Sequence, residues 1–282
     1  MRSLIVNADD FGLSSGVNRA IIECHTRGIV TSATLMANMP AFDESVELAK
    51  ENPSLGVGLH FNITQGYPVA EPSRIRSLLN ASGEFLGTST QLAKRAILGR
   101  LRKHEVAIEL RAQIERILSR GLGLTHVDSH KHAHALPQIF EAVVETIGEY
   151  GIGALRLPRD RARFSGASLK LAKQSMLAFG LSLLCRPNAG KLRNAEIETS
   201  DGFIGVAHTG FWTKEWLMNV ITTLPPGATE LMCHPGYDSD ELDAIKTRLR
   251  GSRVNESRLL TDPDVARKLE EQGIRLINFS EL

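Results

Sequence analysis

Cysteine is scarce in this chain, and its scarcity limits both the fold and the compartment. Only Cys24, Cys185 and Cys233 occur in 282 residues, far apart and without a CxxC spacing. A disulfide framework and a zinc ribbon are therefore excluded, and a reducing compartment is favoured. Charge of one sign is also missing, because the net charge is +1 and the signs are interspersed. We therefore expect a small-molecule partner and no nucleic acid, whose phosphates require a basic stripe.

Long hydrophobic runs are absent as well. The N-terminus, MRSLIVNADD, reaches acidic residues too early for a signal peptide. The apolar run that starts at Met176 covers about ten residues, whereas a helix that spans a bilayer needs roughly 20. We expect a cytoplasmic protein without a transmembrane anchor. A GxSxG nucleophile motif is also lacking, and we expect Cys233 to be a buried strand residue and not a nucleophile.

Short apolar runs alternate with segments of helical period along the whole chain. The chain is 42% hydrophobic and 23% charged, which suits a soluble protein with a sizeable core. The alternation predicts an α/β fold with about seven parallel strand-helix units in a single domain, residues 1–282. Strands are expected over residues 3–7, 33–37, 55–61 and 124–128 and around Leu155, Leu231 and Leu276, and helices over residues 17–24, 43–51, 106–118, 137–150, 214–223 and 264–271. Periodicity alone does not separate a TIM-like barrel from a doubly wound open sheet.

Polar side chains gather where the predicted strands end. Outside a histidine-rich cluster, these residues are Asp9, Asp10, His60, Arg156 and His234. The cluster itself, HVDSHKHAH at residues 126–134, holds four of the nine histidines. Because the carboxyl ends of parallel strands lie on one face, we expect all these segments to converge. Histidine is the commonest nitrogen ligand for metals, so the cluster indicates a metal or proton-transfer site.

A catalytic metal needs ligands on one side and open positions on the other. One carboxylate and two imidazoles provide this arrangement, and Asp10, His60 and one histidine of the cluster fit it. Spacing does not choose between His126 and His130, because a residue at a strand end can turn with the loop. Asp128 is expected either to hold the second ring N–H of a ligand histidine or to cap the turn.

The motifs NADDFG, GLHFN, HVDSHKHAH and CHPG, with the Arg156-Leu157-Pro158 segment, together resemble the YdjC-like carbohydrate deacetylase family, which includes chitooligosaccharide deacetylases. Their order and spacing match from residue 7 to residue 236. The resemblance implies a distorted (β/α) barrel, a divalent metal and hydrolysis of an N-acetyl group on an amino sugar. It further implies these roles: metal ligands at Asp10, His60 and His130, a catalytic base at Asp9, and a histidine of the active-site wall at His234.

Two segments resemble one branch of that family more than the other. Residues 201–210, DGFIGVAHTG, and residues 230–236, ELMCHPG, resemble the hopanoid-associated, HpnK-like deacetylases. This implies a hopanoid-linked glycolipid as one substrate class. Lys131 departs from the chitooligosaccharide branch, which tends to show a further histidine there. We assign substrate binding to Arg156, His132 and His134, and leave open that the two histidines orient metal ligands instead.

Deacetylation agrees with the chemistry of these residues. Amide hydrolysis needs a nucleophile, stabilisation of an oxyanion and a proton for the leaving amine. A divalent metal supplies the first two, Asp9 can take the proton of the water, and protonated His234 can give one to the amine. Imidazole ligands favour zinc as the cofactor, while the family leaves magnesium open.

Two other classes of protein fit parts of the sequence. His132-Ala-His134 imitates the HxH motif of amidohydrolase-like or phosphoesterase-type metal hydrolases, although that motif usually opens the first strand. A catalytically silent sugar-binding protein could use the same cleft, and it would not need Asp9. The sequence leaves the oligomeric state open.

Residues 169–185, LKLAKQSMLAFGLSLLC, are either an ordinary helix packed on the barrel or a lipid-facing surface. With Lys170, Lys173 and Arg186 flanking the apolar side chains, the segment could lie in a membrane interface or line an apolar entrance for a lipid-linked sugar. Soluble chitooligosaccharides would be better served by aromatic platforms, and aromatic residues make up only 5%. An amino sugar or a glycolipid is therefore the expected substrate, with peripheral membrane contact left open.

Overall fold

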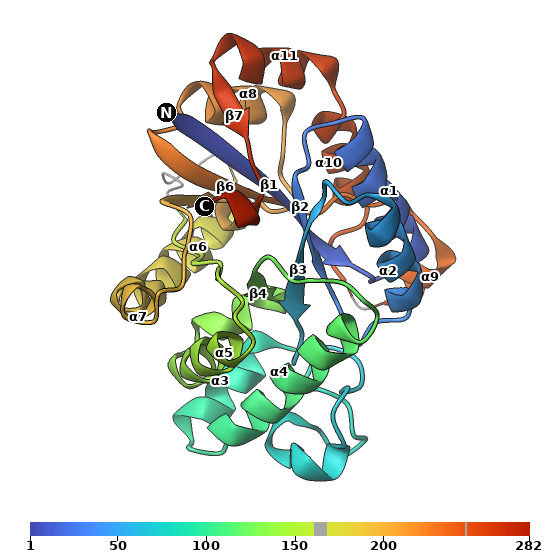
Figure 1. Ribbon diagram of the computed structural model, residues 1–282, viewed down its shortest axis with the longest axis vertical. Coiled ribbons are helices and arrows are strands. Elements are labelled where there is room, and N and C mark those ends of the chain that lie inside the picture. The colour runs from blue at the N-terminus through green and yellow to red at the C-terminus, as the bar shows by residue number, and fades with distance from the viewer. Residues whose placement is uncertain (161–167, 246) are drawn as a thin grey trace.

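Seven strands form the centre of the protein in the computed structural model, which describes residues 1–160, 168–245 and 247–282 (Figure 1). Every strand pairs in parallel with its neighbour. Their bounds are β1 Arg2–Phe11, β2 Ser32–Leu35, β3 Gly56–Phe61, β4 Val127–Ser129, β5 Gly202–Ile204, β6 Gly227–Cys233 and β7 Ile274–Leu276. The parallel α/β fold expected from the alternating pattern is confirmed.

The longest strand, β1, lies at the middle of the sheet. The order is β4-β3-β2-β1-β6-β5, and β7 pairs with the first residues of β1 on the edge that β2 occupies further along. Single parallel bridges continue the sheet beyond its ends: Val127 pairs with Leu155, Ala154 with Glu198, and Asp160 with Phe203. These bridges curl the sheet into a distorted barrel, which agrees with the barrel that the family resemblance implied.

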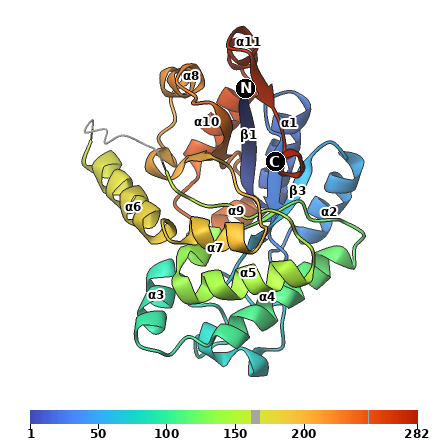
Figure 2. The same cartoon turned by 60° about the vertical axis from the view of Figure 1, so that its left-hand side comes forward.

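Helices cover the outside of the sheet (Figures 1 and 2). In the described residues their bounds are α1 Ser15–Thr26, α2 Phe42–Glu51, α3 Ser89–Ile97, α4 Lys103–Leu118, α5 Pro137–Glu149, α6 Leu169–Cys185, α7 Asn188–Asn194, α8 Lys214–Thr222, α9 Asp240–Ala244, α10 Gly251–Leu260 and α11 Pro263–Glu271. Side-chain caps fix several starts: Ser14 accepts a hydrogen bond from the N–H of Val17, and Ser168 from that of Leu171. No described helix is long and apolar enough to cross a membrane.

The alternation of side chains along β1 separates the core from the site. Leu4, Val6 and Ala8 join the main core between sheet and helices. Ile5 points the other way and packs inside the barrel with Phe279. Asn7 and Asp9 follow Ile5 at the same spacing of two, so the strand carries polar side chains up the inside of the barrel toward its carboxyl end.

Several elements differ from the sequence-based expectation. The strand expected at residues 124–128 begins only at Val127, and the region around Leu155 contributes single bridges and no strand. β5 was not expected, because three residues are too few to show a period. Four helices, α3, α7, α9 and α10, were also missed. The period of α10 is hidden because it buries charged Arg253 and Glu256, which a hydrophobic pattern does not reveal.

Candidate active site

Asp9 and Asp10 lie together at the carboxyl end of β1. Side chains of consecutive strand residues normally point to opposite faces, yet both carboxylates line one cavity. Asp10 makes this possible because its backbone lies in the left-handed region, with φ 71°, where the pairing of β1 with β2 is irregular. A non-glycine residue in this region is strained, and such strain is often found at functional sites.

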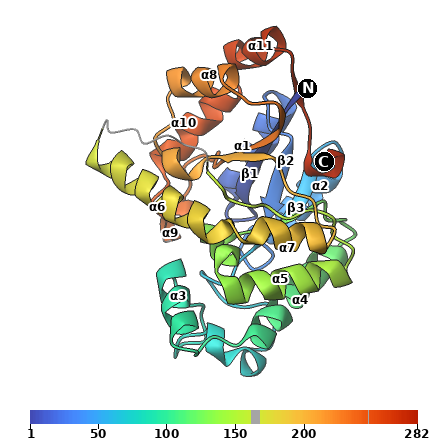
Figure 3. The same ribbon diagram turned by 90° about the vertical axis from the view of Figure 1, so that its left-hand side faces the viewer.

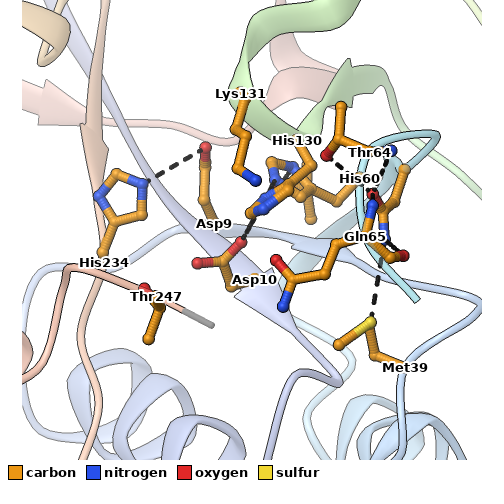
Figure 4. A network of polar contacts seen from close by, with 12 residues as sticks. Asp9, Asp10, Met39, His60, Thr64, Gln65, His130, Lys131, His234 and Thr247 are labelled. Carbon is orange, nitrogen blue, oxygen red and sulfur yellow. Dashed lines mark hydrogen bonds and ion pairs between the residues drawn. The ribbon is translucent and has the colours of Figure 1, made fainter. Parts of the chain in front are cut away.

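Three potential ligand atoms meet beside Asp10. Its Oδ1 lies 3.1 Å from Nδ1 of His130 and 3.4 Å from Nε2 of His60, and those two nitrogens are 3.4 Å apart. The residues come from the ends of β1, β3 and β4, so the curl of the sheet brings them together (Figure 4). This is the three-residue set that the family resemblance implied.

Neighbouring side chains orient each of these ligand atoms. Asp128 Oδ1 accepts a hydrogen bond from His60 Nδ1 at 2.6 Å, which turns Nε2 toward Asp10. Thr34 donates to the other carboxylate oxygen of Asp128 at 3.1 Å. Asp10 Oδ2 accepts a hydrogen bond from the buried Arg253, which leaves Oδ1 facing the histidines. Of the two roles expected for Asp128, its contact with His60 matches the orienting one.

The spacing of the three atoms fits a divalent metal. Two ligand atoms at about 2.1 Å from one ion lie about 3.0–3.4 Å apart at octahedral or tetrahedral angles. The charge also fits: although burial opposes it, Asp128, Asp10 and Asp9 raise the pKa of His60 to about 10, so the site attracts positive charge. A second set, Asp9, His60 and Asp128, is also close enough to hold an ion. Its two carboxylates already pair with Arg156, which makes it the poorer site.

Asp9 is held by a buried arginine. Arg156 is 0% exposed and donates to both carboxylate oxygens of Asp9, at 2.7 and 2.8 Å, and to Glu230 at 2.7 Å. Burial alone would raise the pKa of Asp9, but Arg156, His60 and His234 lower it far below its usual value. Asp9 is therefore ionised at neutral pH and fixed in orientation.

His234 faces Asp9 across the site (Figure 4). Its Nε2 lies 4.0 Å from Asp9 Oδ2, and its backbone N–H donates to Glu256 at 2.6 Å. Burial lowers the pKa of His234 to about 4, even though Asp9 and Asp10 act in the opposite direction. The imidazole is therefore neutral near pH 7, so it can accept a proton before it donates one.

These side chains form the floor of a cavity of about 1050 Å³. We define the cavity floor as Asp9, Asp10, His60, His130 and His234. One wall is apolar and comes from α6, and we define this α6 wall as Leu177, Leu181 and Leu184. Across the cavity, the start of α3 contributes Ser89, Thr90 and Ala93. The cavity thus offers a polar, charged floor and an apolar side.

Known proteins resemble this chain over almost its whole length. The family model described as YdjC-like protein matches residues 3–271. A carbohydrate deacetylase of Geobacillus stearothermophilus is 37% identical over 99% of this chain and 98% of its own length. A chitooligosaccharide deacetylase of Yersinia enterocolitica is 34% identical over 99% of this chain and 98% of its own length.

The chain belongs to the YdjC-like family. A solved structure supports the fold: a protein of Enterococcus faecalis, named as a candidate for cellobiose-phosphate cleavage, superposes with a TM-score of 0.78 at 25% identity. The superposition covers 99% of this chain and 98% of that one. The whole fold is therefore common to this YdjC-like chain and that protein.

The remaining histidines of the 126–134 cluster lie in three different places. His126 is one layer deeper in the barrel, stacked on Phe279, and its Nε2 contacts Asn7 at 3.1 Å. Gly58 faces its ring so closely that a Cβ there would lie 2.5 Å from it, so only glycine fits. His126 thus lies outside the set formed by Asp10, His60 and His130.

The two residues of the HxH pair do not converge. His132 lines the cavity, and its Nδ1 has no hydrogen-bond partner in the described part of the chain. His134 is buried, contacts Ser129 at 2.5 Å and the carbonyl of Arg156 at 3.0 Å, and lies off the cavity lining. The segment His130–Ala135 is kinked at its start, because Lys131 and His132 both have positive φ, 55° and 53°. This separation does not favour the amidohydrolase-like or phosphoesterase reading.

Three supporting residues escaped the sequence analysis. Arg253 lies 243 positions after Asp10 in the chain, and nothing local marks it. Glu256 lies on the same unrecognised helix. Glu230 did leave a signal, because a carboxylate inside the apolar strand segment ATELMC must be paired when buried. Cys233 is buried in β6, as expected.

Proposed function

We propose that this protein is a carbohydrate deacetylase that uses a divalent metal ion held by Asp10, His60 and His130 to hydrolyse the N-acetyl group of an amino sugar. The observation that carries the proposal is the meeting of these three ligand atoms, 3.1–3.4 Å apart, beside the ionised carboxylate of Asp9. The full-length similarity to curated carbohydrate deacetylases supports the reaction class. Imidazole ligands favour zinc, and magnesium is the second candidate.

The metal supplies Lewis acidity toward a water molecule and an amide carbonyl. Asp9 accepts the proton of that water, because it lines the same cavity and is already ionised. Arg156 holds Asp9 in place through both carboxylate oxygens and lowers its basicity. Arg156 does not line the cavity. Its role in the proposal is therefore to position Asp9, and it acts on the substrate only through Asp9.

His234 delivers a proton to the leaving amine. It is neutral in the resting protein, so the proton must first reach it. Asp9, which has taken the proton of the water, passes it to Nε2 of His234, 4.0 Å from Asp9 Oδ2, and His234 then gives it to the amine as the C–N bond breaks. His132 contacts the sugar in this proposal, since it lines the cavity beside His130. His134 supports the loop that presents His130 and His132, through Ser129 and the Arg156 carbonyl.

The finer proposal concerns the substrate. The α6 wall gives the cavity an apolar side that a free oligosaccharide, covered in hydroxyl groups, does not match. An N-acetylglucosamine that carries an apolar aglycone, such as a hopanoid, places its acetamido group on the floor and its aglycone on the wall. The resemblance of residues 201–210 and 230–236 to the hopanoid-associated branch supports this choice.

Two linked measurements test the proposal. Metal content and acetate release are first measured on purified protein, before and after chelation and metal addition. Acetate release that survives complete loss of metal would rule out a metal-dependent reaction. Release of phosphate from p-nitrophenyl phosphate, without acetate release from any amino sugar, would favour the phosphoesterase class, and sugar binding without turnover would favour a silent binding protein.

The substrate class is tested with a matched pair, methyl and octyl N-acetylglucosaminide, the latter below its micellar concentration. We expect the octyl compound to have the higher kcat/KM. Leu177→Asn removes an apolar contact that is partly exposed, so the advantage of the octyl compound should fall roughly threefold to tenfold while the methyl compound is unaffected. Equal kcat/KM for both compounds would remove the lipid-linked substrate and leave the deacetylase intact.

A further inference from the structure

Helix α6 exposes large apolar side chains that neither pack on the barrel nor line the cavity. One side of it packs on the barrel through Leu171, Ala178 and Cys185. Another side forms the α6 wall of the cavity. A third group points outward and lines no cavity, with Phe179 53% and Leu183 42% exposed. Large apolar side chains exposed together in this way indicate a contact surface.

A second pair of exposed apolar side chains lies at the end of α3, the helix whose first residues line the same cavity. Ile97 at the end of α3 is 86% exposed, and Leu98 next to it is 53% exposed. Residues of both helices line the cavity, and Figure 3 shows α3 and α6 on the same side of the molecule. We use the name apolar rim for the exposed side chains of Phe179, Leu183, Ile97 and Leu98, together with that of Met176, which also borders the cavity.

The two sequence segments that carry the apolar rim contain charge of one sign only. Residues 85–104 and residues 169–195 each contain five basic residues and no acidic residue, although the whole chain has 33 basic and 32 acidic residues. Three of the basic residues beside the rim, Lys94, Lys170 and Lys173, are exposed and form no ion pair with any described residue. Basic side chains around an apolar surface match the interface of a membrane that contains anionic lipids.

We propose that the apolar rim docks this protein on an anionic lipid bilayer, with the mouth of the cavity turned toward the membrane. Phe179 and Leu183 enter the headgroup region, and Lys170 and Lys173 contact lipid phosphates. The proposal goes beyond the deacetylase function and does not rest on it, because docking needs no turnover. Its consequence for a lipid-linked substrate is direct: the substrate reaches the α6 wall from the bilayer without crossing water.

A second copy of the chain fits this surface less well. Two rims packed face to face around a twofold axis would bring their lysines together, and like charges oppose such a contact. A bilayer with anionic headgroups satisfies the apolar and the basic side chains at the same time. The absence of a membrane-spanning helix among the described residues agrees with a peripheral mode of binding.

The test is sedimentation of the full chain with vesicles of phosphatidylcholine alone or with 30% phosphatidylglycerol. We expect binding to the anionic vesicles, little to phosphatidylcholine, and a marked loss at high salt. Phe179→Asp and Leu183→Asp should each weaken binding about tenfold or more, since each puts a charge into the interface. Lys173→Glu, which changes two charges, should weaken it about tenfold or more, since each charge near the surface is worth roughly fivefold.

Matched controls lie elsewhere on the molecule. Leu118→Asp replaces a side chain of similar exposure at the end of α4, and Arg19→Glu makes the same charge change on α1, on the other side of the barrel (Figures 1 and 2). Both should bind vesicles like the wild type. Turnover of methyl N-acetylglucosaminide separates the two proposals, because the rim variants should leave it unchanged.

Three results would overturn the docking proposal. One is wild-type protein that does not sediment with anionic vesicles under any salt condition. Another is equal vesicle binding by the rim variants and the wild type. The third is a stable dimer in analytical ultracentrifugation that Leu183→Asp dissociates, without vesicle binding, which would assign the surface to a second copy. None of these results depends on whether the protein hydrolyses an amide.

Discussion

The cavity floor and the α6 wall are built in opposite ways. Each charged floor residue is buried and held by a partner far away in sequence, such as Arg156 for Asp9 and Arg253 for Asp10. The wall consists of consecutive turns of one helix, with leucines that are partly exposed and make no polar contact. The difference teaches that a few substitutions in α6 can change the substrate, whereas the chemistry of the floor depends on the whole barrel.

The largest effect should follow from removing a metal ligand. His60→Ala and His130→Ala should each lose the metal and all measurable activity together, on every substrate, because open metal sites seldom tolerate the loss of a third protein ligand. Metal content by mass spectrometry and acetate release measure both properties. His126→Ala should keep its metal, since His126 contacts Asn7 and Phe279 instead. Full metal occupancy in either ligand variant would contradict the assignment of the floor.

The next effect separates proton transfer from metal binding within the floor. Asp9→Asn should retain metal but lose roughly 10²–10⁴ in kcat, the usual contribution of a positioned general base. His234→Ala should behave similarly, with a greater loss for poorer leaving groups. The methyl and octyl glycosides should be affected equally, unlike in α6 wall variants. A raised KM with unchanged kcat would show that these residues bind substrate and do not transfer protons.

The smallest effect concerns the stability of the floor at different pH values. Burial raises the pKa of Glu256 from 4.5 to about 7, although hydrogen bonds from the backbone of His234 and Gly210 and the charge of Arg253 oppose the shift. The pKa of Glu256 is thus higher in the folded protein than in the unfolded chain, where it is 4.5. This difference stabilises the fold below pH 4.5, and the stabilisation is lost as the pH rises through 7. Glu256→Gln should therefore remove part of the fall in unfolding free energy between pH 5 and pH 8, on the order of 1–3 kcal/mol.

Urea unfolding at pH 5 and pH 8 measures this change. Glu51→Gln, an exposed position at the end of α2, is the control and should leave the pH dependence as it is. Rim and wall variants should also leave it unaltered, because they remove no buried carboxylate. An unchanged pH dependence in Glu256→Gln would show that Glu256 is ionised in the folded protein throughout this range.

The regular part of the fold could be predicted because its signals are local. The helices at residues 43–51, 106–118 and 264–271 show a helical period, and each lies within or closely matches an observed helix. Short pieces could not be predicted in this way: β5 has three residues, and Leu155 joins the sheet through single bridges. Their conformation is decided by neighbouring strands, which a local pattern does not contain.

The sequence by itself placed Asp9, Asp10, His60 and His234 at strand ends. Because parallel strands end on one face of the barrel, it also predicted that these residues converge. Only the tertiary structure decided which cluster histidine meets Asp10, since His126 lies one layer deeper in the barrel against Asn7, whereas His130 follows the end of β4 and contacts Asp10. It also decided that Arg156 lies behind Asp9. These outcomes depend on contacts between residues more than a hundred positions apart, and such contacts form only when the sheet curls.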